Sequence, residues 1–182
     1  MTRYVAFLRG INVGGHKIVR MEDLRRRFEA LGFGNVSTYK ASGNVRFESG
    51  DSDGKAIRTR TQRELRSIFG DEVEVLLRSV AELEGVVRLA PFRRPPHPSA
   101  VPFVTFVAKA IAAPSRLPLR SPRADIEVFR VRGRDVFSWS LPGADQRFGF
   151  PNLFVEKLFG QPATTRNWST VTGVILPTSA PG

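Results

Sequence analysis

Hydrophobic positions recur at intervals of three and four residues in two stretches of the first half of the chain, which is typical of amphipathic helices. The first predicted helix, residues 21–32, has its apolar face at Met21, Leu24, Phe28 and Leu31. The second, residues 54–70, has its apolar face at Ile57, Thr61, Leu65 and Ile68. Each stretch ends on a glycine, Gly32 or Gly70, a residue that suits the end of a helix.

Short apolar runs before, between and after these helices predict four strands. Their ranges are 4–10, 36–40, 44–49 and 73–78. The second and third strands are joined by the sequence ASGN, a turn typical of hairpins. The resulting β-α-β-β-α-β order predicts an α+β fold whose first half, residues 1–78, is ferredoxin-like, with two helices on one face of an antiparallel sheet.

A bridging segment, residues 79–100, follows. Ser79 and Glu82 have the spacing of a capping box, which predicts that a helix starts there. The sequence PFRRPPHPSAVP (91–102) then holds five prolines in twelve residues and indicates a linker. His97, inside it, is expected to be solvated.

The second half, residues 101–176, is expected to be a related α/β subdomain. Its predicted strands are 103–109, 125–131 and 135–141, the last two forming a hairpin, while 112–124 is expected to be irregular. A helix is predicted over 152–160 with Asn152 as its N-cap. We expect a last helix to start near Thr164 or Thr165, and the tail, 177–182, to be loose.

Charge adds a functional hint to this architecture. The net charge of the 182 residues is +11, a value that attracts polyanions. However, the chain holds 23 Arg and only 5 Lys, a bias that GC-rich coding alone can produce. The sequence has no signal peptide and no membrane-spanning run, so we expect a cytoplasmic protein that does not enter membranes. The absence of cysteine excludes disulfides, thiolate metal sites and a cysteine nucleophile.

Three segments, FLRGINVGG, ALGFGNVSTYKASGNVRF and ATTRNWSTV, occur in this order along the chain. Together they resemble the family known as domain of unknown function 1697, over roughly residues 3–175. The resemblance implies an α+β fold with a ferredoxin-like unit and no established activity. PGADQRFGF, at residues 142–150, departs from the Gly/Ser-rich segment that the family has there.

The loop LRGINVGG, residues 8–15, is the first candidate site. Gly10 and Gly15 have the spacing of a phosphate-binding P-loop, but His16 and Lys17 stand where that motif needs Lys and then Ser or Thr. We therefore exclude a P-loop nucleoside triphosphatase. Two interpretations stay open, a loop whose N–H groups bind an anion and a tight turn that needs glycine only for its shape.

The sheet raises the possibility of an RNA-recognition module, which has the same element order. Ser42 and Asn44 stand where the stacking aromatics of that module belong, which argues against it. We also expect the end of the first strand to lie nearer the end of the third strand than its start. This arrangement would place Asn12 away from Asn44, which argues against a site shared by the two residues.

The segment TTRNWST is the second candidate site. Arg166 offers a planar fork of donors to a phosphate or carboxylate, Trp168 offers a stacking face, and Thr164 is a candidate helix cap. The alternative is that Trp168 is part of the core and Arg166 bonds a backbone carbonyl or an acidic group.

Basic runs elsewhere are expected to be solvated surface. Arg58, Arg63 and Arg66 belong to one such helix face. Three further arginines in the irregular segment can contact phosphates without sequence specificity, namely Arg116, Arg120 and Arg123.

Taken together, the sequence predicts a protein that binds a phosphate-bearing small molecule or a nucleic acid. The predicted ligand-binding residues are Arg9, Asn12, Gly14, Gly15, His16, Arg166 and Trp168. Neither a cofactor nor a metal is expected, because two separated histidines do not make a zinc site. The alternatives are an enzyme that uses His16 as an acid–base group and a structural or regulatory domain that binds a partner.

Overall fold

The computed structural model describes residues 1–11 and 19–176. The chain divides into two compact units, the first made of Met1–Gly85 with Gly173–Gly182 and the second of Val86–Thr172. The subdomain boundaries expected from the sequence stay predictions. Within the described ranges we find no helix with the length and apolar character that crossing a membrane requires.

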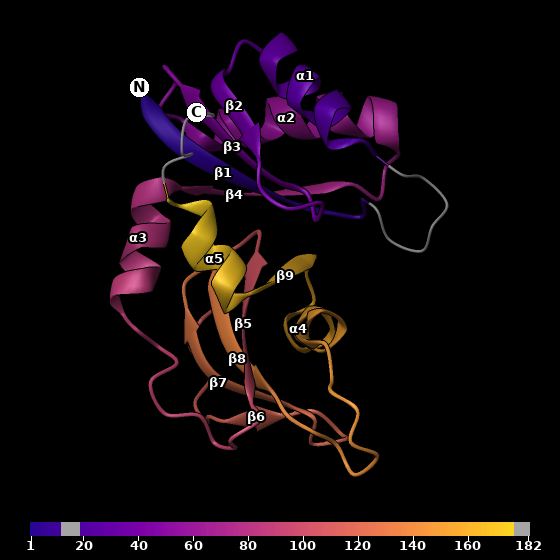
Figure 1. Ribbon diagram of the computed structural model, residues 1–182, viewed down its shortest axis with the longest axis vertical. Coiled ribbons are helices and arrows are strands. Elements are labelled where there is room, and N and C mark those ends of the chain that lie inside the picture. The colour runs from indigo at the N-terminus through magenta and orange to yellow at the C-terminus, as the bar shows by residue number, and fades with distance from the viewer. Residues whose placement is uncertain (12–18, 177–182) are drawn as a thin grey trace, which may run out of the picture. The chain divides into compact units, whose positions relative to one another are not determined.

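The first unit is a ferredoxin-like sheet covered by two helices, as the sequence predicts (Figure 1). Its strands, in the antiparallel order β2-β3-β1-β4, are β1 (Thr2–Arg9), β2 (Gly34–Thr38), β3 (Asn44–Ser49) and β4 (Glu74–Ser79). The helices are α1 (Met21–Ala30) and α2 (Gly54–Phe69). Leu24 and Phe28 of α1 and Ile57 and Leu65 of α2 share a hydrophobic core with Phe47 of the sheet.

Two details of the first unit differ from expectation. Ile68 is 36% exposed instead of buried, because the interval of four from Thr61 and Leu65 continues to Phe69, which packs against the core. The expectation that the end of the first strand lies near the end of the third was also wrong. Phe7 at the end of β1 pairs with Asn44 at the start of β3, as antiparallel neighbours must, so the strand ends give no reason to separate the two segments.

The bridging segment confirms the capping box. Helix α3 (Val80–Arg88) begins where the backbone N–H of Ser79 donates to Glu82 Oε2 at 2.7 Å and that of Glu82 donates to Ser79 Oγ at 3.1 Å. Residues 89–100 form turns and bends, and His97 is exposed there, as predicted. Its Nδ1 accepts a hydrogen bond from the backbone of Ser99 at 3.0 Å.

The second unit is an antiparallel sheet with one helix, α4 (Pro151–Phe159), packed against it (Figure 1). Its strands, in the order β6-β7-β8-β5-β9, are β5 (Val101–Val107), β6 (Leu119–Arg120), β7 (Ile126–Arg132), β8 (Asp135–Ser140) and β9 (Ala163–Asn167). Val155 of α4 shares a core with Val107, Val136 and Ala163 of the sheet. β5 starts earlier than expected and includes Pro102.

Two predictions at the C-terminal end were wrong. Asn152 is not the cap of α4, because this helix begins after Phe150. The Oδ1 of Asn152 instead accepts a hydrogen bond from Thr165 Oγ1 at 3.2 Å. Thr164 and Thr165 lie in β9, because β-branched residues favour a strand that can pair, and β9 pairs with β5. The last helix, α5 (Trp168–Val174), starts later.

Asn167, and not Thr164, is the residue that caps α5. Its Oδ1 accepts hydrogen bonds from the backbone N–H and the hydroxyl of Ser169, both at 2.9 Å.

Candidate anion-binding surface

The Gly loop lies only partly in the structure. Asn12, Gly14, Gly15 and His16 lie outside the described residues, so their predicted role in binding is not tested. Arg9 is described at the end of β1, where it is partly exposed and pairs in register with Glu74 of the edge strand β4.

Gly10 shows why the segment starts with glycine. Its φ is +80°, and a Cβ at this position would lie 2.6 Å from the carbonyl oxygen of Glu72. A side chain is therefore excluded both by conformation and by space. The next residue, Ile11, is buried against the hairpin turn, since a Cβ on Gly43 would lie 2.5 Å from Ile11 Cδ1.

Arg166 is buried in β9, with 8% of its surface exposed. Its guanidinium donates to Thr164 Oγ1 at 2.7 Å and to the backbone oxygen of Thr165 at 2.9 Å. Burial lowers the pKa of the group to about 10. A bond from Arg166 to a backbone carbonyl is what we expect if this residue only supports packing. A role of Arg166 in ligand binding stays a prediction.

Trp168 packs within the second unit. Its ring meets the ring of Phe92 edge-on, with centroids 5.1 Å apart, and Phe92 also contacts Trp139 and Phe129. Trp168 remains partly exposed, so its use as a stacking face stays a prediction. Arg9 belongs to the first unit, whereas Arg166 and Trp168 belong to the second.

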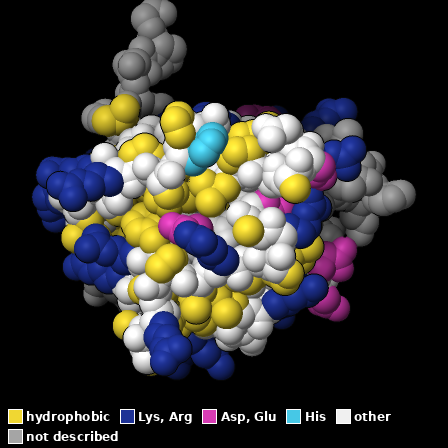
Figure 2. Space-filling model, turned by 90° about the horizontal axis from the view of Figure 1, so that it is seen from below, with side chains coloured by type: hydrophobic (Ala, Val, Ile, Leu, Met, Phe, Trp, Pro, Cys, Tyr) yellow, Lys and Arg dark blue, Asp and Glu magenta, His cyan; other side chains and the backbone are white. Residues whose placement is uncertain are grey.

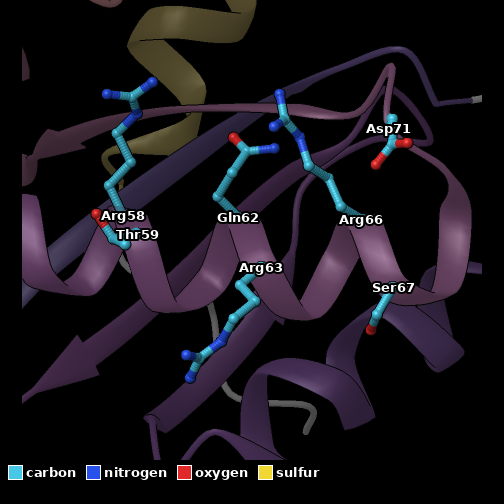
Figure 3. Close-up of a pocket in the computed structure, with 7 residues that line it drawn as sticks. All are labelled: Arg58, Thr59, Gln62, Arg63, Arg66, Ser67 and Asp71. Carbon is cyan, nitrogen blue, oxygen red and sulfur yellow. The ribbon is translucent and has the colours of Figure 1, made fainter.

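The basic face of α2 divides into two sets of side chains that the sequence did not distinguish. Arg58, Gln62 and Arg66 extend from the helix to one side in Figure 3, whereas Arg63 extends to the other. The first set has spacings of four residues, which aligns it along one edge of the helix.

This first set bonds the outer edge of β4. Arg58 Nε donates to the carbonyl of Val75 at 3.0 Å, and Arg66 Nε donates to that of Val73 at 3.2 Å. Gln62 donates to the carbonyl of Val73 and accepts from the N–H of Val75 at 2.7 Å. Because an edge strand leaves backbone groups unpaired, these side chains satisfy groups that a further strand would otherwise bond.

Glu74 holds the two arginines of that set in place. Its carboxylate forms a hydrogen-bonded ion pair with Arg66 and lies 3.9 Å from Arg58, and its side chain is only 16% exposed. The expectation that Arg58 and Arg66 belong to a solvated face was therefore wrong, since both are partly buried and paired. The signal for this in the sequence is the 58–62–66 spacing, but Glu74 and β4 are found only in the fold.

The second set is exposed and we call it the cationic face of α2: Lys55, Arg60 and Arg63. Among the residues that the structure describes, no hydrogen bond or ion pair engages the Lys55 ammonium or the Arg63 guanidinium. Arg60 lies over the ring of Phe33, 4.8 Å from its centroid. The helix carries five Lys and Arg in sixteen residues against one acid, Glu64.

Two shallow hollows run along this helix. One, of about 540 Å³, is lined by the seven residues in Figure 3, and the other, of about 480 Å³, reaches Asp53 and Lys55 at the start of the helix. Both include Thr59 and Arg63. Asp71 lines the first hollow, and the following residue in the chain is Glu72. Gly10 approaches the carbonyl of Glu72, so the Gly loop begins beside this surface.

The acidic group at the start of the helix, Asp53, is already bonded. The carboxylate of Asp53 caps α2 by accepting from the backbone N–H groups of Lys55 and Ala56 at 2.8 and 3.2 Å. Within the described ranges no group of three or more His, Asp and Glu side chains is placed to hold a metal ion. The arrangement provides donors and positive charge, which are the groups that bind phosphate oxygens.

Two comparisons place the chain among known proteins. A family model described as "Protein of unknown function (DUF1697)" matches residues 1–137. A solved structure of a conserved bacterial protein from Streptococcus pneumoniae superposes with a TM-score of 0.67 at 20% sequence identity, covering 96% of this chain and 97% of that one. This likeness confirms the α+β fold. No curated protein matches the sequence.

Proposed function

Because this chain belongs to the DUF1697 family of proteins of unknown function, we propose a function from its own side chains. It binds a phosphate-bearing anion, either a nucleic acid or a phosphorylated small molecule, at the cationic face of α2. The observation that carries the proposal is the pair of exposed cations, Lys55 and Arg63, whose charged groups form no ion pair within the described residues.

Charge supports this proposal both at long range and at contact. A net charge of +11 draws anions toward the protein from a distance, with a strength that falls as salt rises. At contact, the Arg63 guanidinium offers a planar fork that matches two phosphate oxygens, and the Lys55 ammonium adds a point charge. Figure 2 does not view α2, but the face that it shows also carries many Lys and Arg side chains and few Asp and Glu side chains, so positive charge extends beyond this helix.

The Gly loop is the second part of the proposed site. Its first residues leave β1 beside Asp71 and Glu72, at the end of the α2 hollow. Arg9, Asn12, Gly14, Gly15 and His16 extend the proposal on the first unit. Arg166 and Trp168, in the second unit, stay separately predicted ligand contacts. If Asn12→Ala and Arg166→Ala leave ligand affinity unchanged, this extension is wrong, while the α2 face is tested separately.

The test uses a fluorescein-labelled single-stranded RNA of 12 nucleotides, followed by fluorescence anisotropy at fixed salt. Replacing both cations, in Lys55→Ser with Arg63→Ser, is expected to weaken binding about tenfold, because two phosphate contacts are lost. A matched control, Arg94→Ser with Arg132→Ser, removes the same charge from exposed sites in the second unit.

The comparison separates a local site from general charge. The control is expected to weaken binding clearly less than the α2 variant does. Equal effects of the two variants, or no binding of either RNA or inorganic pyrophosphate, would contradict the proposal. Displacement of the RNA by pyrophosphate at micromolar concentration indicates a small phosphorylated ligand, and resistance to it indicates a nucleic acid.

A further inference from the structure

The second unit has a concave surface lined by hydrophobic side chains that water reaches. Phe148, Phe150, Leu153 and Leu158 are 47, 58, 66 and 37% exposed. They line a hollow of about 760 Å³ between α4 and the segment that precedes it. We call this surface the α4 groove. Contiguous exposed hydrophobic side chains of this kind are typical of interaction sites, because leaving them in water is unfavourable.

The wall of the α4 groove is fixed by its own contacts. Gly149 lies so close to the neighbouring strand that a Cβ there would be 2.7 Å from Asp125 Cγ, and its carbonyl accepts from Ser140 Oγ. The N–H of Leu141 donates to the carbonyl of Asp125 at 2.8 Å. The ring of Phe150 meets that of Phe103 edge-on at 5.6 Å. The groove is therefore formed before any partner arrives.

Positive charge lies at the margin of the groove. Arg147 has 83% of its side chain exposed, and its contact with Asp145 is a long one, at 3.9 Å. In the part of the chain that the structure describes, no hydrogen bond or ion pair engages the Lys157 side chain. Arg123 is held by Asp145 at 3.1 Å.

The acidic group in the lining does not balance this charge. Asp125 is buried, accepts from Ser121 Oγ at 2.7 Å and forms an ion pair with Arg123 at 3.5 Å, so its charge is engaged by Arg123 and not by Arg147 or Lys157. Arg147 and Lys157 thus remain available to an acidic group that enters the groove.

We propose that the α4 groove binds a segment of another protein that presents hydrophobic side chains flanked by Asp or Glu. The apolar floor supplies the surface to bury, and Arg147 and Lys157 select carboxylates at its margin. This inference is independent of the α2 face, which lies in the other unit.

Other occupants match these features less well. A second copy of this chain also carries a charge of +11 and is repelled. A nucleic acid leaves the apolar floor without a hydrophobic counterpart. A bilayer takes up side chains that protrude, whereas these line a hollow.

The test selects peptides from a random peptide display library on the immobilised full-length protein. Enriched peptides are expected to contain at least two large hydrophobic residues and more Asp and Glu than Lys and Arg. A synthetic peptide of the enriched sequence is expected to bind at least about tenfold more weakly to Leu153→Ser and to Lys157→Glu, a difference of about 1.4 kcal/mol.

Leu176→Ser is the matched control, because Leu176 is similarly exposed, at 61%, but belongs to the first unit. It is expected to bind the peptide as the wild type does, and circular dichroism checks the fold of each variant. The proposal is overturned if no peptide is enriched, if the enriched peptides are basic, or if Leu153→Ser binds them normally. Binding to phosphatidylglycerol vesicles that requires Leu153 also overturns it, in favour of a membrane.

Discussion

Gly10 illustrates how one residue in a suggestive motif can be required by the fold. The GINVGG segment raised two interpretations, an anion-binding loop and a tight turn. For Gly10 the second is sufficient, since its positive φ and its approach to the carbonyl of Glu72 both exclude a side chain. The phosphate-loop spacing of Gly10 and Gly15 therefore carries less functional weight than the pattern suggests.

Gly10→Ala is expected to lower the free energy of unfolding by about 2 kcal/mol or more, because strain from φ adds to a backbone collision. Gly32→Ala is the control. Gly32 has the same φ of +80°, yet a Cβ on Gly32 would have no neighbour within 4 Å. The loss in Gly32→Ala is expected to be about 1 kcal/mol. Urea denaturation measures both, and equal losses would show that the contact with Glu72 has no energetic role.

Arg63 and Arg66 show what single residues in a sequence do not reveal. Both are arginines on one helix, three residues apart, and the sequence assigned them the same solvated role. The fold separates them, since Arg66 bonds β4 and Glu74 while Arg63 stays exposed. The difference depends on the position of β4 beside α2, and no local sequence pattern encodes that position.

The contact between α2 and β4 is the element-scale feature on which the first unit depends. β4 is an edge strand of the sheet, and an open edge is a site for unwanted strand pairing. Side chains from α2 bond its outward backbone groups at Val73 and Val75. The helix thus covers the sheet face with its apolar side chains and closes the edge with its polar ones.

Gln62→Ala removes both hydrogen bonds that this side chain makes at the edge of β4. We expect the free energy of unfolding to fall by about 1–3 kcal/mol, since the N–H of Val75 loses its side-chain partner and the carbonyl of Val73 keeps only Arg66. Thr59→Ala, an exposed change on the same helix, is expected to stay within about 0.5 kcal/mol of the wild type. Thermal unfolding compares them. A Gln62→Ala protein as stable as Thr59→Ala would mean that water replaces the Gln62 amide at the strand edge without cost.

Prediction of elements from the sequence succeeded where local signals agree with packing. The two helices of the first unit, the ASGN hairpin and the Ser79–Glu82 capping box all appear in the structure. It failed at 163–167, where threonines that resemble a helix start instead pair with β5 across the sheet. Thr165 Oγ1 lies 2.8 Å from Thr105 Oγ1, a contact between residues sixty positions apart that no local pattern contains.

For the molecule as a whole, the sequence predicted the fold class and the positive charge, but not the surfaces. The α4 groove joins residues near 121–126 with residues 147–158, and the cationic face of α2 becomes distinct only once Glu74 engages the other arginines. Each unit thus carries one candidate surface, basic in the first and hydrophobic with a basic margin in the second.

The most direct test of the central claim is the salt dependence of RNA binding by the wild type, the Lys55→Ser/Arg63→Ser protein and the Arg94→Ser/Arg132→Ser control. We expect the slope of log affinity against log salt to become shallower by about 1.4 in the α2 variant, because two phosphate contacts of a single strand are lost. The control is expected to keep the wild-type slope. An unchanged slope in the α2 variant, or the same decrease in the control, would show that the phosphates contact the protein elsewhere and would contradict the account.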